Sequence, residues 1–330
     1  MTTMQALIGE LPAQLRWAAE ARVPDVAPAT EAVVAGMGGS GIAGAIASVI
    51  ADRAGRRVSV HRCYGLPGWA AAHRPLVVAV SHSGNTEETV SAAEEAAAAD
   101  MDLAVVTAGG RLAAWAEHGG RPVLRIPAAP QPRAAVGRLA GGTLRILEAA
   151  GVLPPQGPGL LEAAAVVEGL LEGPGPALAA DIAEALERRV AVVYGGYGIG
   201  EVAAGRWKTQ INENGKAPAF SGVLPELDHN EVVGWTAWPD LSVSGIGIVW
   251  LHDPGDHPRV EMRAEITRRL LEDRVTVAAE VYAAGESPLA RLFSLMVIGD
   301  LVSVAIAERA GVDPMKVEAI DDLKARLEET

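Results

Sequence analysis

The sequence predicts an α/β protein with two doubly wound parallel-sheet subdomains and a helical C-terminus. Three observations support this prediction. The chain has 330 residues, which at ~150 residues per domain favours two domains. Short apolar runs alternate with alanine-rich helical stretches, the pattern of a parallel sheet covered on both faces. A strand, a glycine-rich loop and a helix follow one another in the same order twice.

The first half alternates strands and helices regularly. Its predicted strands are 31–35, 58–60, 76–80, 103–107 and 123–126, and its predicted helices are 4–21, 42–54 and 86–99. Prolines then punctuate two short helices, 160–171 and 178–189, as in an interdomain connection. The second half has predicted strands at 189–194, 241–249 and 275–281, and closing helices at 288–310 and 314–327. We therefore predict an N-terminal domain at 1–150 and a C-terminal domain with linker helices at 151–330.

Composition excludes several classes of function. With 28 basic and 41 acidic residues the net charge is −13, which argues against nucleic-acid binding and against an anionic membrane surface. The single cysteine, Cys63, cannot form an internal disulfide or a Cys-based zinc site, which fits a reducing cytoplasm. No secretory signal is expected at 1–17, and no apolar stretch is expected to reach the ~18 residues of a membrane span. We expect a cytoplasmic protein.

A glycine-rich loop, Gly36-Met-Gly-Gly-Ser-Gly41, follows the first strand and opens a helix. Its glycines let backbone N–H groups approach a phosphate, with the positive end of the helix dipole behind them. We expect Gly38, Gly39 and Ser40 to bind the substrate. The loop is repeated 159 residues later as Gly195-Gly-Tyr-Gly-Ile-Gly200, where isoleucine replaces the serine, so that only the first copy keeps a hydroxyl.

A second loop, Ser81-His-Ser-Gly-Asn-Thr-Glu-Glu88, carries three hydroxyls at the start of the next helix, on Ser81, Ser83 and Thr86. The alternative interpretation is a simple N-cap by Thr86, which explains one hydroxyl of the three. Two neighbouring loops of this kind favour a cradle for a phosphate monoester. Arg133 follows another expected strand, and its guanidinium can take two phosphate oxygens, although a lone arginine is more often a surface residue.

The glycine loop also fits the Gly-x-Gly-x-x-Gly pattern of dinucleotide-binding proteins. That pattern expects an acidic residue at the end of the second strand, where this chain has Arg62 instead. A nicotinamide-dependent oxidoreductase is therefore a minor alternative. The segment 252–257 holds two histidines and two aspartates, but Pro254 and Gly255 mark a turn rather than a metal site. We predict no metal and no cofactor.

The two loops resemble those of sugar isomerase (SIS) domains, which have flavodoxin-like folds and bind sugar phosphates. Four further blocks resemble the bifunctional phosphoglucose/phosphomannose isomerases, and together with the loops they span residues ~30–327. These blocks are Gln131-Pro-Arg-Ala-Ala-Val-Gly137, Asn212-Glu-Asn-Gly-Lys-Ala-Pro-Ala-Phe220, Glu226-Leu-Asp-His-Asn-Glu-Val-Val-Gly-Trp235 and Ile320-Asp-Asp-Leu-Lys324. The resemblance implies a metal-independent aldose–ketose isomerase that interconverts fructose 6-phosphate with glucose 6-phosphate and mannose 6-phosphate through an enediol. It also implies that Arg133 faces the phosphate.

The resemblance further implies three catalytic residues. Glu213 would be the base that moves the C2 proton. On the residues alone a glutamate after a helix is usually solvated, but the flanking amides of Asn212 and Asn214 could orient its carboxylate. His229 would assist ring opening and would reach the site from the other subunit of a homodimer. On the residues alone it is either a histidine that the neighbouring Asp228 carboxylate orients or a loop histidine with no role.

Lys324 would help at the ring oxygen. Without the resemblance, Lys324 is better interpreted as a solvated lysine paired with Glu328 at i, i+4. A hydroxyl near this lysine would grant mannose tolerance, but the position seven residues earlier is Val317, and Ser303 is the other candidate. The alternative function is a non-catalytic sugar-phosphate sensor on the same fold.

Overall fold

The computed structural model of the chain describes residues 3–329 and divides them into two compact units. The N-terminal unit comprises Glu10–Glu168 and Gly285–Ala290. The C-terminal unit comprises residues 3–9, Gly169–Ala284 and residues 291–329. The predicted boundary at residue 150 therefore lies before the helix α8 (Gly157–Glu172), most of which belongs to the N-terminal unit.

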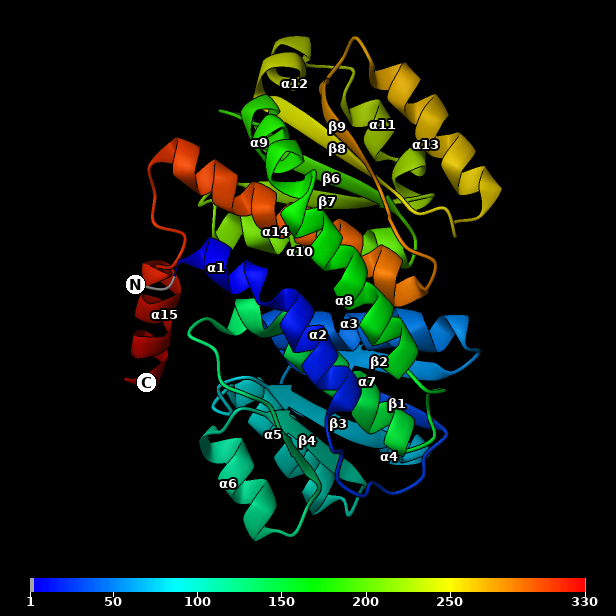
Figure 1. Cartoon of the computed structure of the whole chain (residues 1–330), viewed down its shortest axis with the longest axis vertical. Helices are drawn as coiled ribbons and strands as arrows, with labels where there is room; N and C mark the ends of the chain where they lie inside the picture. Colours follow the sequence, from blue (N-terminus) through cyan, green and yellow to red (C-terminus); the bar gives the residue numbers. More distant parts are fainter. Residues whose placement is uncertain (1–2, 330) are drawn as a thin grey trace. The chain divides into compact units, whose positions relative to one another are not determined.

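The N-terminal unit is built on a five-stranded sheet whose strands are all parallel, in the order β2-β1-β3-β4-β5 (Figure 1). The strands are β1 (Glu31–Ala35), β2 (Arg57–His61), β3 (Leu76–Ser81), β4 (Leu103–Thr107) and β5 (Val123–Arg125). Its helices are α2 (Leu11–Glu20), α3 (Gly38–Arg53), α4 (Ala70–His73), α5 (Glu87–Ala98), α6 (Gly110–His118), α7 (Val136–Ala149) and α8, with a 3-10 turn η1 (Pro132–Ala135). The doubly wound prediction is confirmed here.

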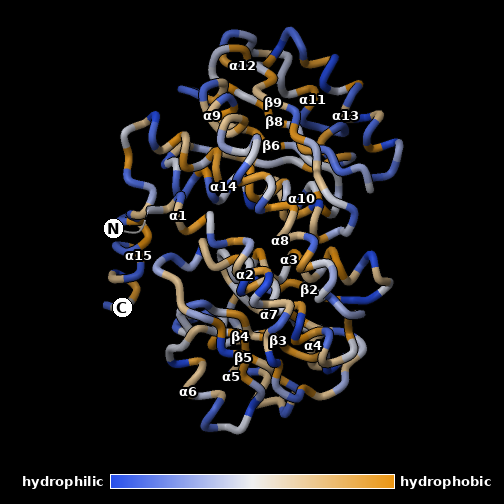
Figure 2. Tube along the Cα trace, viewed as in Figure 1, coloured by the Kyte–Doolittle hydropathy of each residue, from blue (hydrophilic) through white to orange (hydrophobic). Residues whose placement is uncertain are grey.

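The burial of the central strands of this sheet explains why their sequences are continuous apolar runs. Every residue of β3 and of β4 is buried, as expected for central parallel strands covered on both faces. Figure 2 shows hydrophobic segments at both strands. Valine and alanine dominate them, which lets helices such as α5 and α7 pack closely on the sheet.

The C-terminal unit repeats the plan with a four-stranded parallel sheet in the order β7-β6-β8-β9. Its strands are β6 (Val190–Gly196), β7 (Ala219–Leu224), β8 (Ile246–His252) and β9 (Thr276–Tyr282). Its helical elements are α1 (Met4–Gly9), α9 (Gly175–Ala185), α10 (Ile199–Glu213), η2 (Glu226–His229), α11 (Glu231–Gly234), α12 (Pro239–Gly245), α13 (Pro258–Leu271), α14 (Pro288–Ala310, from Arg291 onward) and α15 (Glu318–Glu328). The helical C-terminus is confirmed.

Some element boundaries differ from the sequence-based expectation. The opening helix 4–21 is two helices, since α1 ends at Gly9 and α2 starts anew with Pro12 in its first turn. The strand expected at 241–249 is wrong at its start, because Pro239–Gly245 is the helix α12 and the strand begins at Ile246. The strand β7 and the helix α13 were not expected.

The helix α14 corrects the expectation that no apolar stretch is long enough to cross a membrane. It has 23 residues, and an 18-residue window of it has a mean hydropathy of 2.0. In the structure 83% of that window is buried, as in the core helix of a folded domain. Length and composition alone therefore do not make α14 a membrane span.

Both sheets reverse their strand order at one point. β1 lies between β2 and β3, and β6 lies between β7 and β8. In such sheets ligands bind outside the carboxyl ends of the strands on either side of this reversal. Ligands are therefore expected at the loops after β1 and β3 in the first unit, and at those after β6 and β8 in the second.

Candidate functional site

The glycine loop after β1 is shaped by close backbone packing. Gly38 adopts a φ of +50°, and a Cβ on Gly36 would lie 2.8 Å from the carbonyl oxygen of Val80 on β3. The helix α3 begins at once, with the N–H groups of Ser40 and Gly41 donating to the carbonyl of Met37. Side chains larger than hydrogen are excluded at Gly36, and the loop presents its backbone at the start of a helix, where anions bind.

The loop after β3 lies beside it and holds its hydroxyls in a fixed arrangement. Ser81 Oγ accepts a hydrogen bond from the Gly84 N–H at 3.0 Å and lies 2.9 Å from Thr86 Oγ1. Ser83 Oγ accepts from the Asn85 N–H at 3.2 Å. Thr86 is the N-cap residue of α5, but its side chain makes no capping hydrogen bond. The capping interpretation of Thr86 is therefore wrong, and its hydroxyl belongs with that of Ser81.

The residue between the serines, His82, is buried and supports the loop. Its Nε2 accepts a hydrogen bond from the Ala129 N–H at 3.1 Å, which requires an unprotonated nitrogen. Burial, with a smaller effect of the nearby Arg138 charge, lowers the pKa of His82 below its usual value. A neutral His82 therefore ties the loop to the segment that precedes η1.

Arg133 lies against the glycine loop in the same unit. A Cβ on Gly39 would be 3.5 Å from Arg133 Cα, so the backbone of η1 touches the start of α3. The arginine is 5% exposed, and its Nη1 donates to Gln131 Oε1 at 2.8 Å. The structure thus brings Ser40 and Arg133 to one end of the first sheet, near the loop of Ser81. Sequence reasoning missed Gln131, although it belongs to the same family block as Arg133.

The C-terminal unit contains the counterparts of both loops, with different chemistry. Gly195 and Gly200 are in close backbone contact, as Gly36 and Gly41 are in the first copy. The loop after β8 has the same length as the loop after β3, since the N-cap residues His257 and Thr86 each lie five positions after the strand end. The repeat seen in the sequence therefore extends to the second loop.

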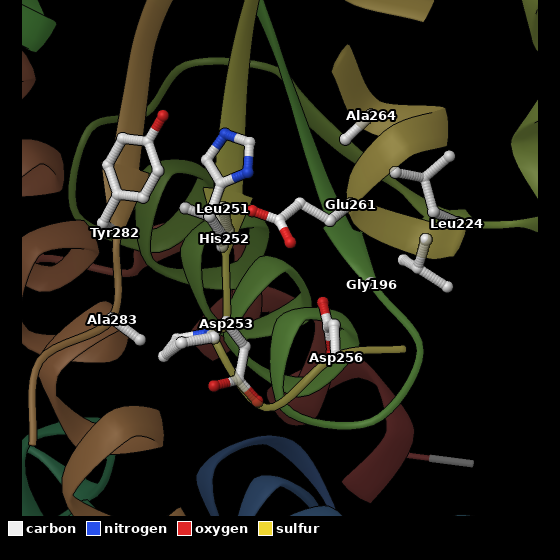
Figure 3. A pocket seen from close by; sticks show the side chains of 12 residues that line it. Gly196, Leu224, Leu251, His252, Asp253, Asp256, Glu261, Ala264, Tyr282 and Ala283 are labelled. Carbon is white, nitrogen blue, oxygen red and sulfur yellow. The ribbon is translucent and has the colours of Figure 1, made fainter. Parts of the chain in front are cut away.

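A pocket of about 160 Å³ opens at these counterpart loops, and Figure 3 shows three carboxylates around it. Asp253, Asp256 and Glu261 line it, together with His252 and Tyr282, whose rings stack 4.5 Å apart. Burial lowers the pKa of His252 below its usual value. The second unit thus places carboxylates at the loops where the first unit has hydroxyls.

The segment 252–257, which holds two histidines and two aspartates, is predicted by the sequence to be a turn rather than a metal site. It forms the expected turn after β8, and Asp253 accepts hydrogen bonds from the Gly255 N–H at 3.1 Å and from Arg291 Nε at 2.6 Å. Among the side chains that the structure describes, no group of three or more His, Cys, Asp or Glu is arranged to hold a metal ion. The carboxylate of Asp253 is instead part of an ion pair.

Glu213 is the last residue of α10 and lines a separate pocket of about 600 Å³ in the C-terminal unit. The other lining residues come from the end of α10 and from the segment that leads into α15: Asn212, Lys216, Val312, Asp313, Lys316, Val317, Glu318, Ala319 and Ile320. Sequence reasoning missed Lys216, although it stands in the same block as Glu213, and Lys316, which no pattern marked.

The two asparagines beside Glu213 are fixed by contacts other than its carboxylate. Asn212 Oδ1 accepts a hydrogen bond from the Ala219 N–H on β7 at 2.9 Å. Asn214 is fully buried and donates to Ser303 Oγ at 2.9 Å. These contacts hold the backbone on each side of Glu213, and the orientation of its carboxylate by the two amides stays a prediction.

His229 ends the turn η2 and is exposed. The carboxylate expected to orient it, Asp228, is bound by α13 instead, since its oxygens accept from Arg263 Nη1 at 3.1 Å and Thr267 Oγ1 at 2.7 Å. Asp228 thus anchors the turn that carries His229. Among the residues that the structure describes, those lining the Glu213 pocket do not include His229.

Lys324 is exposed on α15, one turn beyond Ile320, and is likewise absent from the described lining of the pocket. The side chain of its expected partner, Glu328, lies outside the described residues. Val317 does line the pocket, whereas Ser303 is fully buried and bound to Asn214. Ser303 therefore does not supply the hydroxyl expected near Lys324.

Comparison with known proteins identifies the family. The model of the bacterial phospho-glucose isomerase C-terminal SIS domain matches residues 177–327. A bifunctional phosphoglucose/phosphomannose isomerase of Caldicellulosiruptor bescii is 39% identical over 304 residues, covering 90% of this chain and 89% of that protein. One of Aquifex aeolicus is 35% identical over 316 residues, covering 95% of each chain. The chain belongs to the bifunctional phosphoglucose/phosphomannose isomerase family.

The fold agrees with this assignment. The C-terminal domain of glucosamine-fructose-6-phosphate aminotransferase from Francisella tularensis superposes with a TM-score of 0.70 at 15% identity, covering 95% of this chain and 98% of that one. The predicted family, the SIS-type fold and the class of enzyme, an isomerase, are confirmed. The bifunctional phosphoglucose/phosphomannose isomerase family thus accounts for both sheets and for the glycine loops.

Proposed function

We propose that this protein is an aldose–ketose isomerase that interconverts fructose 6-phosphate with glucose 6-phosphate and mannose 6-phosphate. The observation that carries the proposal is the pair of loops at the strand-order reversal of the first sheet. They gather Ser40, Ser81 and Thr86 with the start of α3, and Arg133 lies against them. Hydroxyls, helix N–H groups and a guanidinium together suit a phosphate dianion.

The second unit supports the choice of ligand by contrast. Its counterpart loops have the same length but carry Ile199 in place of Ser40, and carboxylates line their pocket. The same arrangement of backbone therefore presents hydroxyls in one unit and carboxylates, with Asp253 paired to Arg291, in the other. We assign the phosphate group of the substrate to the N-terminal unit, with contacts from Gly38, Gly39, Ser40, Ser81, Ser83, Thr86 and Arg133.

The isomerisation itself requires a base and no external oxidant. Glu213 removes the proton from C2 of the open-chain aldose, which leaves an enediol, and returns it to C1 to give the ketose. The hydroxyl proton moves between O1 and O2, so the atoms and electrons balance within the sugar. A base that serves either C2 configuration makes both aldoses products of one ketose.

His229 and Lys324 act on the ring in this scheme. His229 assists ring opening and reaches the site from the second subunit of a homodimer, which is consistent with its exposed position at the end of η2. Lys324 assists at the ring oxygen. We further propose that the enzyme is cytoplasmic and needs no metal or other cofactor.

A coupled assay in the presence of a chelator tests the reaction. Purified protein should convert fructose 6-phosphate to aldose 6-phosphates, and parallel assays with glucose, mannose and amino-sugar 6-phosphates give the order of preference. Binding of sugar phosphate without turnover would instead support a non-catalytic sensor.

The base is tested with Glu213→Gln, which should lower kcat at least ~10²-fold because a general base contributes about that much. Glu201→Gln is the matched control, since Glu201 is an exposed carboxylate in the first turn of the same helix. Unchanged turnover in Glu213→Gln would remove Glu213 from the mechanism. Sedimentation of the protein, and mixing of Glu213→Gln with His229→Ala subunits, test the dimer: restored activity in the mixture requires a shared site.

A further inference from the structure

Glu213 is the last residue of α10, and the last turn of a helix is its least stable part. Helix ends fray, and a base placed there loses its geometry unless something outside the helix holds it. Asn214, the next residue, makes hydrogen bonds that hold the end of the helix. It is fully buried, and its Nδ2 donates to Ser303 Oγ at 2.9 Å and to Gln210 Oε1 at 3.2 Å.

The direction of these hydrogen bonds is fixed. Ser303 is fully buried on α14 and donates its single proton to the Asp300 carbonyl at 2.6 Å. Its Oγ is therefore an acceptor for Asn214, which must present its NH₂ group. The amide of Asn214 and the hydroxyl of Ser303 thus link the end of α10, directly after Glu213, to α14.

The far end of the link is anchored by a buried ion pair. Arg206 and Asp300 are 1% and 3% exposed, and the Asp300 carboxylate accepts from Arg206 Nε and Nη2, both at 2.9 Å. Trp207 Nε1 also donates to the Leu295 carbonyl at 2.8 Å. Two consecutive residues of α10 are therefore bound to α14 about two turns before Glu213.

The other side of Glu213 is held as well. Asn212 Oδ1 accepts from the Ala219 N–H on β7, and a Cβ on Gly215 would lie 3.0 Å from Ile306 Cγ2 on α14. The backbone from 212 to 215 is thus fixed to a strand on one side and to a helix on the other. Little freedom is left to the main chain that carries the carboxylate.

We propose that Asn214 and Ser303 are positioning residues, which hold the end of α10 so that the Glu213 carboxylate meets the C1–C2 edge of the sugar. The inference rests on the proposed role of Glu213 as the base. A displacement of about 1 Å can cost up to ~10² in rate, because proton transfer requires a narrow range of geometries. Binding of the phosphate, which the N-terminal unit performs, does not depend on this link.

Steady-state kinetics of Asn214→Ala, Ser303→Ala and the double variant test the proposal. Each single variant should lower kcat on the order of 10-fold and leave KM for fructose 6-phosphate within about twofold. The double variant should be no slower than the slower single variant, because both changes break the same link. Ser242→Ala is the matched control: Ser242 is also buried in a helix and bonded to a carbonyl, that of Trp238, and its kcat should not change.

Any of the following results would overturn the proposal. One is a kcat within twofold of the wild type in both single variants while Glu213→Gln loses its activity, which would leave the proposed base intact. The second is additive losses in the double variant. The third is a rise in KM that accompanies the fall in kcat, or a loss of kcat matched by a loss of folded protein in thermal unfolding. Full activity in Glu213→Gln would overturn the base and the positioning role together.

Discussion

Ser81 Oγ and Thr86 Oγ1 lie 2.9 Å apart at the two ends of one loop. Ser81 also accepts the Gly84 N–H, so the loop is closed by hydrogen bonds of its own hydroxyl groups. Such preorganisation lowers the cost of ordering the loop around an anion. The phosphate site of the proposed isomerase is therefore built from a loop that is already in shape.

Removal of the Ser81 hydroxyl should weaken substrate binding. Ser81→Ala loses one hydrogen bond to a charged group and the hydrogen bonds that close the loop. KM for fructose 6-phosphate should therefore rise at least ~10-fold, since a hydrogen bond to a charged group contributes ~1.5–3 kcal/mol. Ser48→Ala on the same unit, in the middle of α3, is the control and should keep the wild-type KM. An unchanged KM in Ser81→Ala would place the phosphate elsewhere.

Gly84 should not tolerate a side chain. Its φ is +68°, and a Cβ would lie 1.8 Å from the Gly109 carbonyl oxygen, so Gly84→Ala forces apart the loops after β3 and β4. We expect the free energy of unfolding to fall by more than ~2 kcal/mol, as strain and steric conflict add. Gly55→Ala is the control, with a φ of +66° and no atom within 4 Å of its Cβ, and should cost only about 1 kcal/mol. Denaturant titration measures both, and equal losses would contradict the close contact.

His82 should make stability depend on pH. Its folded-state pKa is lowered by burial, so the unfolded chain takes up the proton first as the pH falls below 6.5. The free energy of unfolding should therefore be highest above pH 6.5 and should decrease as the pH falls toward the folded-state pKa. In His82→Gln, whose amide oxygen can still accept the Ala129 N–H, this part of the decrease should vanish. Parallel pH profiles of the two proteins would show that His82 titrates normally.

The buried pair of Arg206 and Asp300 should be costly to break on one side only. Asp300→Leu leaves a buried guanidinium without its carboxylate, and we expect a loss of about 3–5 kcal/mol in the free energy of unfolding. The double variant Arg206→Leu with Asp300→Leu should lose less than Asp300→Leu alone, because no charge is left unpaired. Thermal or denaturant unfolding of the three proteins checks this order, and an additive double loss would contradict it.

Most of the first sheet could be predicted because central parallel strands leave a clear pattern. Residues 76–80 and 103–107 are apolar on both faces, and their buried state follows from the helices that cover them. The strand β7 was not predicted, because Phe220 and Ser221 are exposed. The strand lies at the edge of its sheet, where a continuous apolar run is not required. The helix α12 was not predicted, because its apolar residues Leu241 and Val243 were assigned to the strand that follows.

The sequence by itself determined the two-fold repetition of the strand–glycine loop–helix unit, the hydroxyls that distinguish its first copy, and the family. The spacing of glycines and the chemistry of neighbouring side chains are properties of short segments, so they can be recognised in the sequence alone. Only the tertiary structure decided that Asp228 serves Arg263 and Thr267 rather than His229, and that Asn214 reaches Ser303 some 90 positions away. Hydrogen-bond partners across α10, α13 and α14 depend on how the helices pack, and no sequence spacing encodes that packing.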